Sequence, residues 1–315
     1  KMTRLADFSS AGRLKELVEK LTDGGKRSHR FENMAVQNIC TWKSAGLAPV
    51  NTVDIYGFPA EKPLYIFLFE RSKIQMPQLN VRTPSDGHDR VTLVDALKEM
   101  MIIALPYIQK HGELLLDADK VVREEFFKLI ESGEFPFTIR SFGDLIPFYM
   151  DEQQKQDLMK MNPTVPDSFT VGKVNIEKEY EIIHAKLSYA DEAPSELTNL
   201  RLTHLPSVCI RDIDGNLASW EMSHHYGQLT HLYTVGPHRG KGIGQLAELL
   251  LAQKYAKGGL QVFKYVDYDN ESVFRGTMRS PLWKRWVSTR EGNETKEGEE
   301  EIMWTFSIFT LVNPK

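Results

Sequence analysis

A basic, glycine-spaced turn between an apolar strand and an amphipathic helix is the segment of this chain best suited to chemistry. The strand is predicted over residues 229–235 and the helix over 243–257. Glycines remove the Cβ atoms that would keep an anion away from the backbone, and the positive end of a helix attracts it. The turn therefore predicts a phosphate cradle. Its residues are Arg239, Gly240, Lys241, Gly242, Ile243 and Gly244.

Two common phosphate-binding motifs do not fit this turn. The third glycine of G-x-G-x-x-G is missing, and Gly242 stands where a Walker loop needs Ser or Thr. A glycine-rich turn without a ligand is the structural alternative. The spacing Arg-x-x-Gly-x-Gly, at Arg239, Gly242 and Gly244, is similar to the pyrophosphate motif of the GNAT acyltransferase superfamily, which binds acyl-coenzyme A.

The sequences on both sides of the turn narrow this resemblance. Over 174–286 they resemble the C-terminal half of glycine N-acyltransferase-like proteins. The segments that carry the resemblance are 206–210, 218–222, 227–229, 262–271 and the tryptophan-rich 281–286.

The resemblance implies direct acyl transfer from an acyl-CoA such as acetyl-CoA to the amino group of an amino acid or small amine, in a ternary complex. A bulge around residues 232–234 would free backbone N–H groups for the carbonyl oxygen, and Asn270 would contact the pantetheine arm as well as cap a helix. The expected contacts with coenzyme A also include Leu232, Tyr233, Thr234 and Val235.

The general base is where the chain departs from the family. Gln228 stands where glycine N-acyltransferase has a glutamate, and an amide cannot accept the proton of the amine. Thr277 likewise replaces a tyrosine acid found in many members of the superfamily. The alternative function is therefore an acyl-CoA-binding sensor or scaffold with little activity. A third alternative is a protein or peptide acetyltransferase.

Strand parity offers other bases. With a tight turn at 226–227, His225 would lie opposite Gln228 and Glu221 opposite Leu232, on one polar face. Glu221 or His225 would then take the proton, with Gln228 beside them. The structural alternatives are an ion-paired strand residue for Glu221 and a surface turn residue for His225.

His231 falls on the apolar face, which favours a hydrogen-bonded core histidine unless a bulge changes the parity. Adjacent strand histidines point to opposite faces, and no cysteine or carboxylate cluster completes a ligand set. We therefore expect no metal site.

The order of predicted elements favours a two-domain α/β protein with a mixed α+β sheet. We place an N-terminal α/β domain at 1–165, which would suit a degenerate GNAT copy, and a C-terminal GNAT domain at 174–315. A final hairpin is predicted between strands 282–288 and 302–311. Its acidic connection, 291–301, is either a solvated linker or a surface that steers a cationic acceptor.

Composition sets the remaining expectations. A net charge of −4 argues against a nucleic-acid partner, and two cysteines make no disulfide framework. No run reaches the roughly 18 apolar residues of a membrane span. We expect a soluble protein without a membrane partner, in the cytoplasm or alternatively in mitochondria.

Overall fold

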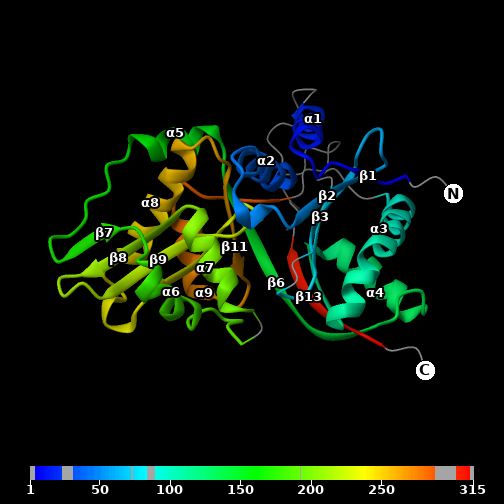
Figure 1. Ribbon diagram of the computed structural model, residues 1–315. Coiled ribbons are helices and arrows are strands. Elements are labelled where there is room, and N and C mark those ends of the chain that lie inside the picture. The colour runs from blue at the N-terminus through cyan, green and yellow to red at the C-terminus, as the bar shows by residue number, and fades with distance from the viewer. Residues whose placement is uncertain are drawn as a thin grey trace.

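One mixed sheet runs through the whole molecule in the computed structural model, which describes residues 4–22, 31–71, 74–83, 89–191, 193–287 and 303–312 (Figure 1). The sheet order is β1-β2-β3-β4-β5-β13-β6-β11-β10-β9-β8-β7, and β12 pairs with β6. The strands are β1 Ala6–Asp7, β2 Val53–Phe58, β3 Tyr65–Glu70, β4 Gln78–Arg82, β5 Glu113–Asp119, β6 Phe137–Met150, β7 Phe169–Gly172, β8 Ser207–Asp212, β9 Leu217–Ser223, β10 Leu229–Thr234, β11 Val262–Asp267, β12 Lys284–Arg285 and β13 Trp304–Leu311.

Helices cover this sheet, α3 and α4 packing on the N-terminal strands and α8 on β8 to β10 (Figure 1). Together the elements confirm the predicted mixed α/β class. The helices are α1 Ala11–Thr22, α2 Phe31–Ser44, α3 Arg90–His111, α4 Lys120–Glu131, α5 Glu152–Lys160, α6 Ile176–His184, α7 Ser195–His204, α8 Ile243–Lys257 and α9 Glu271–Arg279, with short 3₁₀ turns η1 Ala48–Val50 and η2 Gly236–His238.

Each half of the chain contains one parallel strand pair bridged by a helix. These units are β4-α3-β5 and β10-α8-β11, and the other strand pairings are antiparallel. Within each unit the chain leaves one strand, forms a long helix and returns beside the strand that it left. The same local topology therefore occurs twice.

Two long strands join the halves. The first part of β6 pairs with β13, and its last part, from Leu145 to Met150, pairs with β11. Strand β13 also pairs with β5, so the last described strand of the chain lies among strands of the N-terminal half. The predicted hairpin between 282–288 and 302–311 is therefore wrong: β12 and β13 both pair with β6. An apolar pattern identifies a strand without identifying its partner.

The core also crosses the predicted domain boundary. One cluster of buried side chains combines Leu14 and Ile39 of the first two helices with Ile243 and Leu251 of α8. A second cluster belongs to the N-terminal half and includes Phe309 from β13. The division at 165 and 174 stays a prediction, and the acidic segment 291–301 lies outside the described residues.

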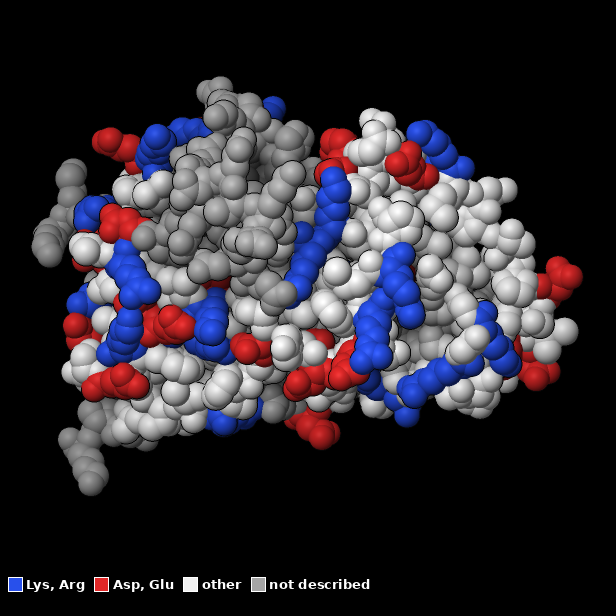
Figure 2. All heavy atoms as spheres, turned by 180° about the vertical axis from the view of Figure 1, so that it is seen from behind, with Lys and Arg blue, Asp and Glu red and all other residues white. Residues whose placement is uncertain are grey.

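The surface carries both signs of charge. On the face seen in Figure 2, acidic and basic side chains of the described residues are interspersed. Among the described residues, no helix is both long and apolar enough to cross a bilayer.

Candidate active site

Strands β10 and β11 meet at one point and then separate. Their only register pair joins Leu229 to Lys264. On its other side, β10 pairs with β9 up to Thr230, loses the register, and resumes pairing at Tyr233. His231, in the gap, has a φ of 56°, a left-handed conformation uncommon outside glycine. A bulge is thus present, but it interrupts the backbone ladder at 231–232, and Tyr233 and Thr234 of the predicted range pair regularly with β9.

The β9–β10 turn is longer than the sequence suggested. Ser223 pairs with Leu229, and the His224 N–H donates to the Gln228 carbonyl at 2.9 Å. The predicted pairing of His225 with Gln228 is therefore wrong by one residue. Beyond the bulge the register shifts back, and Trp220 pairs with Tyr233 and stacks on it at 4.9 Å, as the predicted parity requires.

A helix from the N-terminal half holds this turn. The Asn38 side chain of α2 donates to the carbonyl oxygens of Gly227 and Gln261, each at 2.9 Å, and accepts from the Gln261 N–H at 2.7 Å. Gly227 has a φ of 93°, and a Cβ there would lie 2.7 Å from that of Asn38. The turn geometry therefore depends on a residue far away in the sequence.

The predicted phosphate cradle has an open helix end. Gly242 precedes α8 with a φ of 77°, and no side chain caps the first N–H groups of the helix. A Cβ on Gly244 would lie 2.7 Å from the Thr234 hydroxyl, which shows how closely the helix packs on β10. Arg239 donates to the Thr234 carbonyl at 3.0 Å, and Lys241 is exposed. These features leave backbone donors available to an anion.

The N-terminal half contains the corresponding helix without the opening. At the start of α3, the Asp89 carboxylate accepts from the N–H groups of Val91 and Thr92, at 3.1 and 3.4 Å. The preceding strand pairs with β3 without a bulge and with β5 at three positions. Residues 84–88 lie outside the described part of the chain. A negative side chain thus occupies the helix end that is open in α8.

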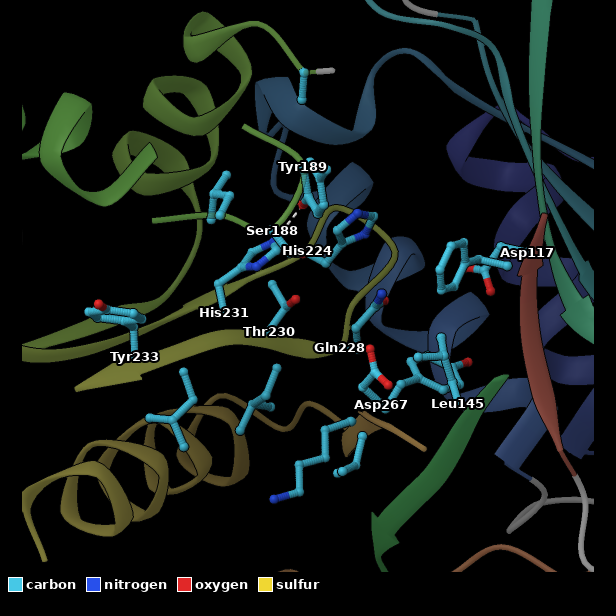
Figure 3. A pocket seen from close by; sticks show the side chains of 18 of the residues that line it. Asp117, Leu145, Ser188, Tyr189, His224, Gln228, Thr230, His231, Tyr233 and Asp267 are labelled. Carbon is cyan, nitrogen blue, oxygen red and sulfur yellow. Dashed lines mark hydrogen bonds between the residues drawn. The ribbon is translucent and has the colours of Figure 1, made fainter. Parts of the chain in front are cut away.

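A cavity of about 700 Å³ lies where β10 and β11 separate (Figure 3). Both halves of the chain line it, with β10 on one side and residues of β4, β5, β6 and β13 on the other. Of the predicted site residues, the cavity brings together Glu221, Gln228, Leu232, Tyr233 and Asn270. Asn270 also caps α9, accepting from the Val273 N–H at 3.3 Å, as predicted.

Glu221 is a buried carboxyl group in this wall. Its side chain is 2% exposed, and its Oε2 atom has no hydrogen-bond partner. Burial, and then the charge of Glu248, raise the pKa of Glu221 well above its ordinary value, although Lys264 opposes the shift. Both carboxylate oxygens of Glu248 have partners, because one pairs with Lys264 and the other accepts from the Trp283 indole at 3.1 Å.

Gln228 and His225 end in different surroundings. Gln228 and Asp267 both line the cavity (Figure 3), and the side-chain oxygen of Gln228 is buried without a partner among the described residues. His225 is fully buried and is not one of the residues that line the cavity. Its Nδ1 accepts from Arg201 at 2.8 Å, and its Nε2 lies 3.6 Å from Glu70. The structure therefore does not bring His225 to the site.

The bulge turns His231 toward the cavity. Its Nε2 shares a hydrogen bond of 2.5 Å with the Tyr189 hydroxyl, drawn in Figure 3. Burial, and secondarily the charge of Arg201, lower the pKa of His231 to about 3, so the ring is neutral. Tyr189 lies in the segment between α6 and α7, and sequence reasoning did not find it or Arg201.

A signal for Arg201 was present in the sequence. Helix α7 follows Pro194, a residue that favours helix starts, and buries Leu197 and Arg201, with the buried Leu205 continuing the interval of four directly after the helix. A charged residue within an apolar stripe indicates a functional or structural role for that residue.

Among the described residues, no group of three or more His, Cys, Asp or Glu side chains is placed to hold a metal ion.

Comparison with known proteins identifies the fold. No family model matches the chain. A solved Drosophila protein is similar over 99% of each chain, with a TM-score of 0.75 and 14% identity. A tandem GNAT protein from the clavulanic acid biosynthesis pathway is similar over 99% of each chain, with a TM-score of 0.55 and 11% identity. The chain therefore has a GNAT fold in a two-domain, tandem arrangement.

Proposed function

We propose that this protein is an acyl-CoA-dependent N-acyltransferase whose acceptor is an amino acid or a small amine. One observation carries the proposal: β10 bulges at His231 and parts from β11 beside the cavity, and the chain then leads to the uncapped N-terminus of α8. The acceptor class follows from the resemblance of residues 174–286 to glycine N-acyltransferase-like proteins.

Coenzyme A would bind along β10 and the start of α8. The backbone at 242–244, with Arg239 and Lys241, would hold the pyrophosphate. Further contacts would come from Val235, Gly240 and Ile243. Leu232, Tyr233, Thr234 and Asn270 would face the pantetheine arm, and backbone N–H groups at the bulge would stabilise negative charge on the carbonyl oxygen.

Glu221 would act as the general base. An amine must lose a proton to attack the thioester carbon, and the C–S bond then breaks to release the thiol of coenzyme A. A carboxylate with a raised pKa is a stronger base than an ordinary one. Glu221 lines the cavity with a free oxygen, whereas Gln228 can only orient the acceptor through hydrogen bonds.

The competing proposal is binding of acyl-CoA without turnover. The observation in its favour is Gln228, whose amide stands at the cavity in place of a carboxylate. Direct transfer predicts thiol release that depends on the acceptor, and a sensor predicts binding alone.

A matched pair of variants at Gly242 tests the cradle. Asn and Asp have nearly the same shape and both tolerate a positive φ, but only Asp places a negative charge at the helix end. We expect Gly242→Asp to bind coenzyme A about tenfold more weakly than Gly242→Asn in calorimetric titration. The unmodified chain should bind one molecule, because Asp89 occupies the corresponding helix end.

The same variants are then assayed for thiol release from acetyl- and benzoyl-CoA with amino acids and amines. Acceptor-dependent release that is weaker in the Asp variant than in the Asn variant supports the proposed enzyme. Binding without release supports the sensor. Equal affinity of the Asp and Asn variants contradicts the cradle.

A further inference from the structure

Arg201 is a buried cation in the cavity wall. The residue is 2% exposed, lies on α7 and lines the cavity. A guanidinium group carries its charge at any ordinary pH, and burying a charge without a counter-charge is costly. The neighbours of Arg201 therefore indicate what it could bind.

Those neighbours are neutral hydrogen-bonding groups. Arg201 donates to His225 Nδ1 from Nη2 at 2.8 Å and from Nε at 3.2 Å. Its Nη2 also lies 3.2 Å from His224 Nε2, and its Nη1 donates to the Tyr189 hydroxyl at 3.5 Å. In the described part of the chain no carboxylate forms an ion pair with Arg201, and Glu70 is reached only through His225.

The three histidines near Arg201 carry no charge of their own. Burial, followed by the charge of Arg201, lowers the pKa of His224 and His225 well below the ordinary value and that of His231 to about 3. The rings are neutral and act as acceptors or weak donors. This part of the wall keeps one positive charge from Arg201.

The acidic residues of the cavity lie elsewhere. Asp117 is held by Asn80 at 2.7 Å and by the Trp304 indole, and Glu248 pairs with Lys264. Asp267 is exposed at the end of β11, and Glu221 has Glu248 and Lys264 as its charged neighbours. None of these carboxyl groups forms an ion pair with Arg201 in the described structure.

We propose that Arg201, with the Tyr189 hydroxyl beside it, binds a substrate carboxylate next to the acyl-transfer centre. The hydroxyl lies 3.5 Å from the guanidinium and 2.5 Å from His231 of the bulge, so charge and transfer site are neighbours. The Nη1 group of Arg201 has the Tyr189 hydroxyl, at 3.5 Å, as its one partner in the described structure, so it keeps an N–H for a carboxylate oxygen, and the charge of the guanidinium strengthens that hydrogen bond. This proposal rests on the proposed function.

The carboxylate has two sources in such a reaction. It belongs either to the acceptor, as in an amino acid, or to the far end of a dicarboxylic acyl group. The assay separates them by comparing glycine with glycinamide as acceptors of acetyl-CoA, and succinyl-CoA with acetyl-CoA as donors to glycinamide. The first pair differs in the carboxylate of the acceptor, and the second pair differs in the carboxylate of the acyl group.

The test variant is Arg201→Gln, with Arg201→Lys to retain the charge without the planar guanidinium group. The matched control is Arg211→Gln, which removes an arginine that donates to Glu179 at 2.6 Å outside the cavity. We expect Arg201→Gln to raise the KM for the preferred carboxylate substrate by about 10- to 100-fold, with a small change for its neutral partner. The KM of Arg201→Lys for the carboxylate substrate should lie between those of the wild type and Arg201→Gln. Arg211→Gln should leave the KM values for the carboxylate substrate and for its neutral partner in the wild-type ratio.

A binding measurement keeps the inference independent of turnover. N-acetylglycine, but not N-acetylglycinamide, should raise the melting temperature of the wild-type chain if the acceptor carries the carboxylate, and N-succinylglycinamide should raise it if the acyl group does. Arg201→Gln should abolish the difference, and Arg211→Gln should retain it. Thermal shifts of this kind without any thiol release would refute the proposed enzyme and support the carboxylate site.

Two results would overturn the inference. The first is wild-type chain that neither uses nor binds carboxylates better than their amides. The second is a folded Arg201→Gln that lowers the use of charged and neutral substrates equally. Should Arg201→Gln not fold, wild-type discrimination and Arg201→Lys decide the question.

Discussion

At the scale of single residues, three ionisable groups meet where β10 joins β11. Glu248 and Lys264 form an ion pair, and Glu221 remains next to them with an unpartnered oxygen. Two carboxyl groups near one ammonium group cannot both be ionised at low cost. Burial first, and then the charge of Glu248, raise the pKa of Glu221, and Lys264 offsets only part of this shift, so Glu221 holds its proton to higher pH.

The raised pKa of Glu221 predicts that replacing this residue increases stability while it decreases activity. Folding favours its protonated form, so the free energy of unfolding falls as pH rises from the unfolded pKa toward the folded one. Glu221→Gln removes this loss. We expect the variant to be less active by about 100-fold, yet more stable at pH 7, by an advantage that grows by about 1.4 kcal/mol per pH unit above roughly pH 4.5.

Urea unfolding between pH 4 and 8, together with thiol release, measures both effects. Glu248→Gln is the control, because it breaks the ion pair with Lys264 and should lower stability throughout. A Glu221→Gln variant that keeps full activity, or whose stability relative to wild type is no greater at pH 7 than at pH 4, would contradict the assigned role.

At the scale of elements, the bulge of β10 decides which side chains face the cavity. The strand was predicted correctly, and the predicted register of Glu221 opposite Leu232 agrees with the observed pairing of Trp220 with Tyr233. The one-residue error at the turn arises because Asn38 of α2 holds Gly227, and contacts so distant in sequence leave no local pattern. His231 was assigned to the core because parity was counted through an unbroken strand.

The left-handed backbone at His231 predicts a difference between substitutions. Asn adopts a positive φ readily, whereas a β-branched residue does not. We expect His231→Asn to stay within about 1 kcal/mol of the wild type and His231→Val to lose about 2 kcal/mol more, with lower thiol release because the bulge is strained. Denaturant unfolding and the acyl-CoA assay measure the two effects.

A neighbouring strand residue supplies the control for this comparison. Thr230 pairs regularly with Met222, so Thr230→Val should change stability by less than about 1 kcal/mol. If Thr230→Val and His231→Val lose equal amounts of stability, the left-handed backbone at position 231 is not the cause of the loss in His231→Val.

Helix prediction failed where polar residues interrupt the apolar pattern. The helix predicted over 243–257 coincides with α8. The sequence reasoning missed α7, because Thr198 and Arg201 occupy half of its buried positions. That helix supplies the cavity with Arg201, so the residues that obscure the pattern are also those available for binding.

At the scale of the whole molecule, the C-terminal strand links the halves. Trp304 of β13 donates to Asp117 of β5, and the Arg82 guanidinium lies 4.7 Å from its ring. Arg82 in turn donates to Tyr265 of β11 at 2.6 Å. The class and the helix-bridged strands were predictable from local patterns. This exchange of strands was not, because each strand would suit either partner.

A continuous sheet and a shared core predict that the two halves unfold together. Chains of this length with two domains often unfold in steps, but here β6 pairs with strands of both halves and one core cluster spans them. We expect a single calorimetric transition whose calorimetric and van't Hoff enthalpies agree. Phe126→Ala in the N-terminal core and Leu251→Ala in α8 should each lower that one transition, by about 3 to 5 kcal/mol in unfolding free energy. Two separate transitions, with each variant shifting only one, would instead show that the strands shared between the halves do not couple their stability.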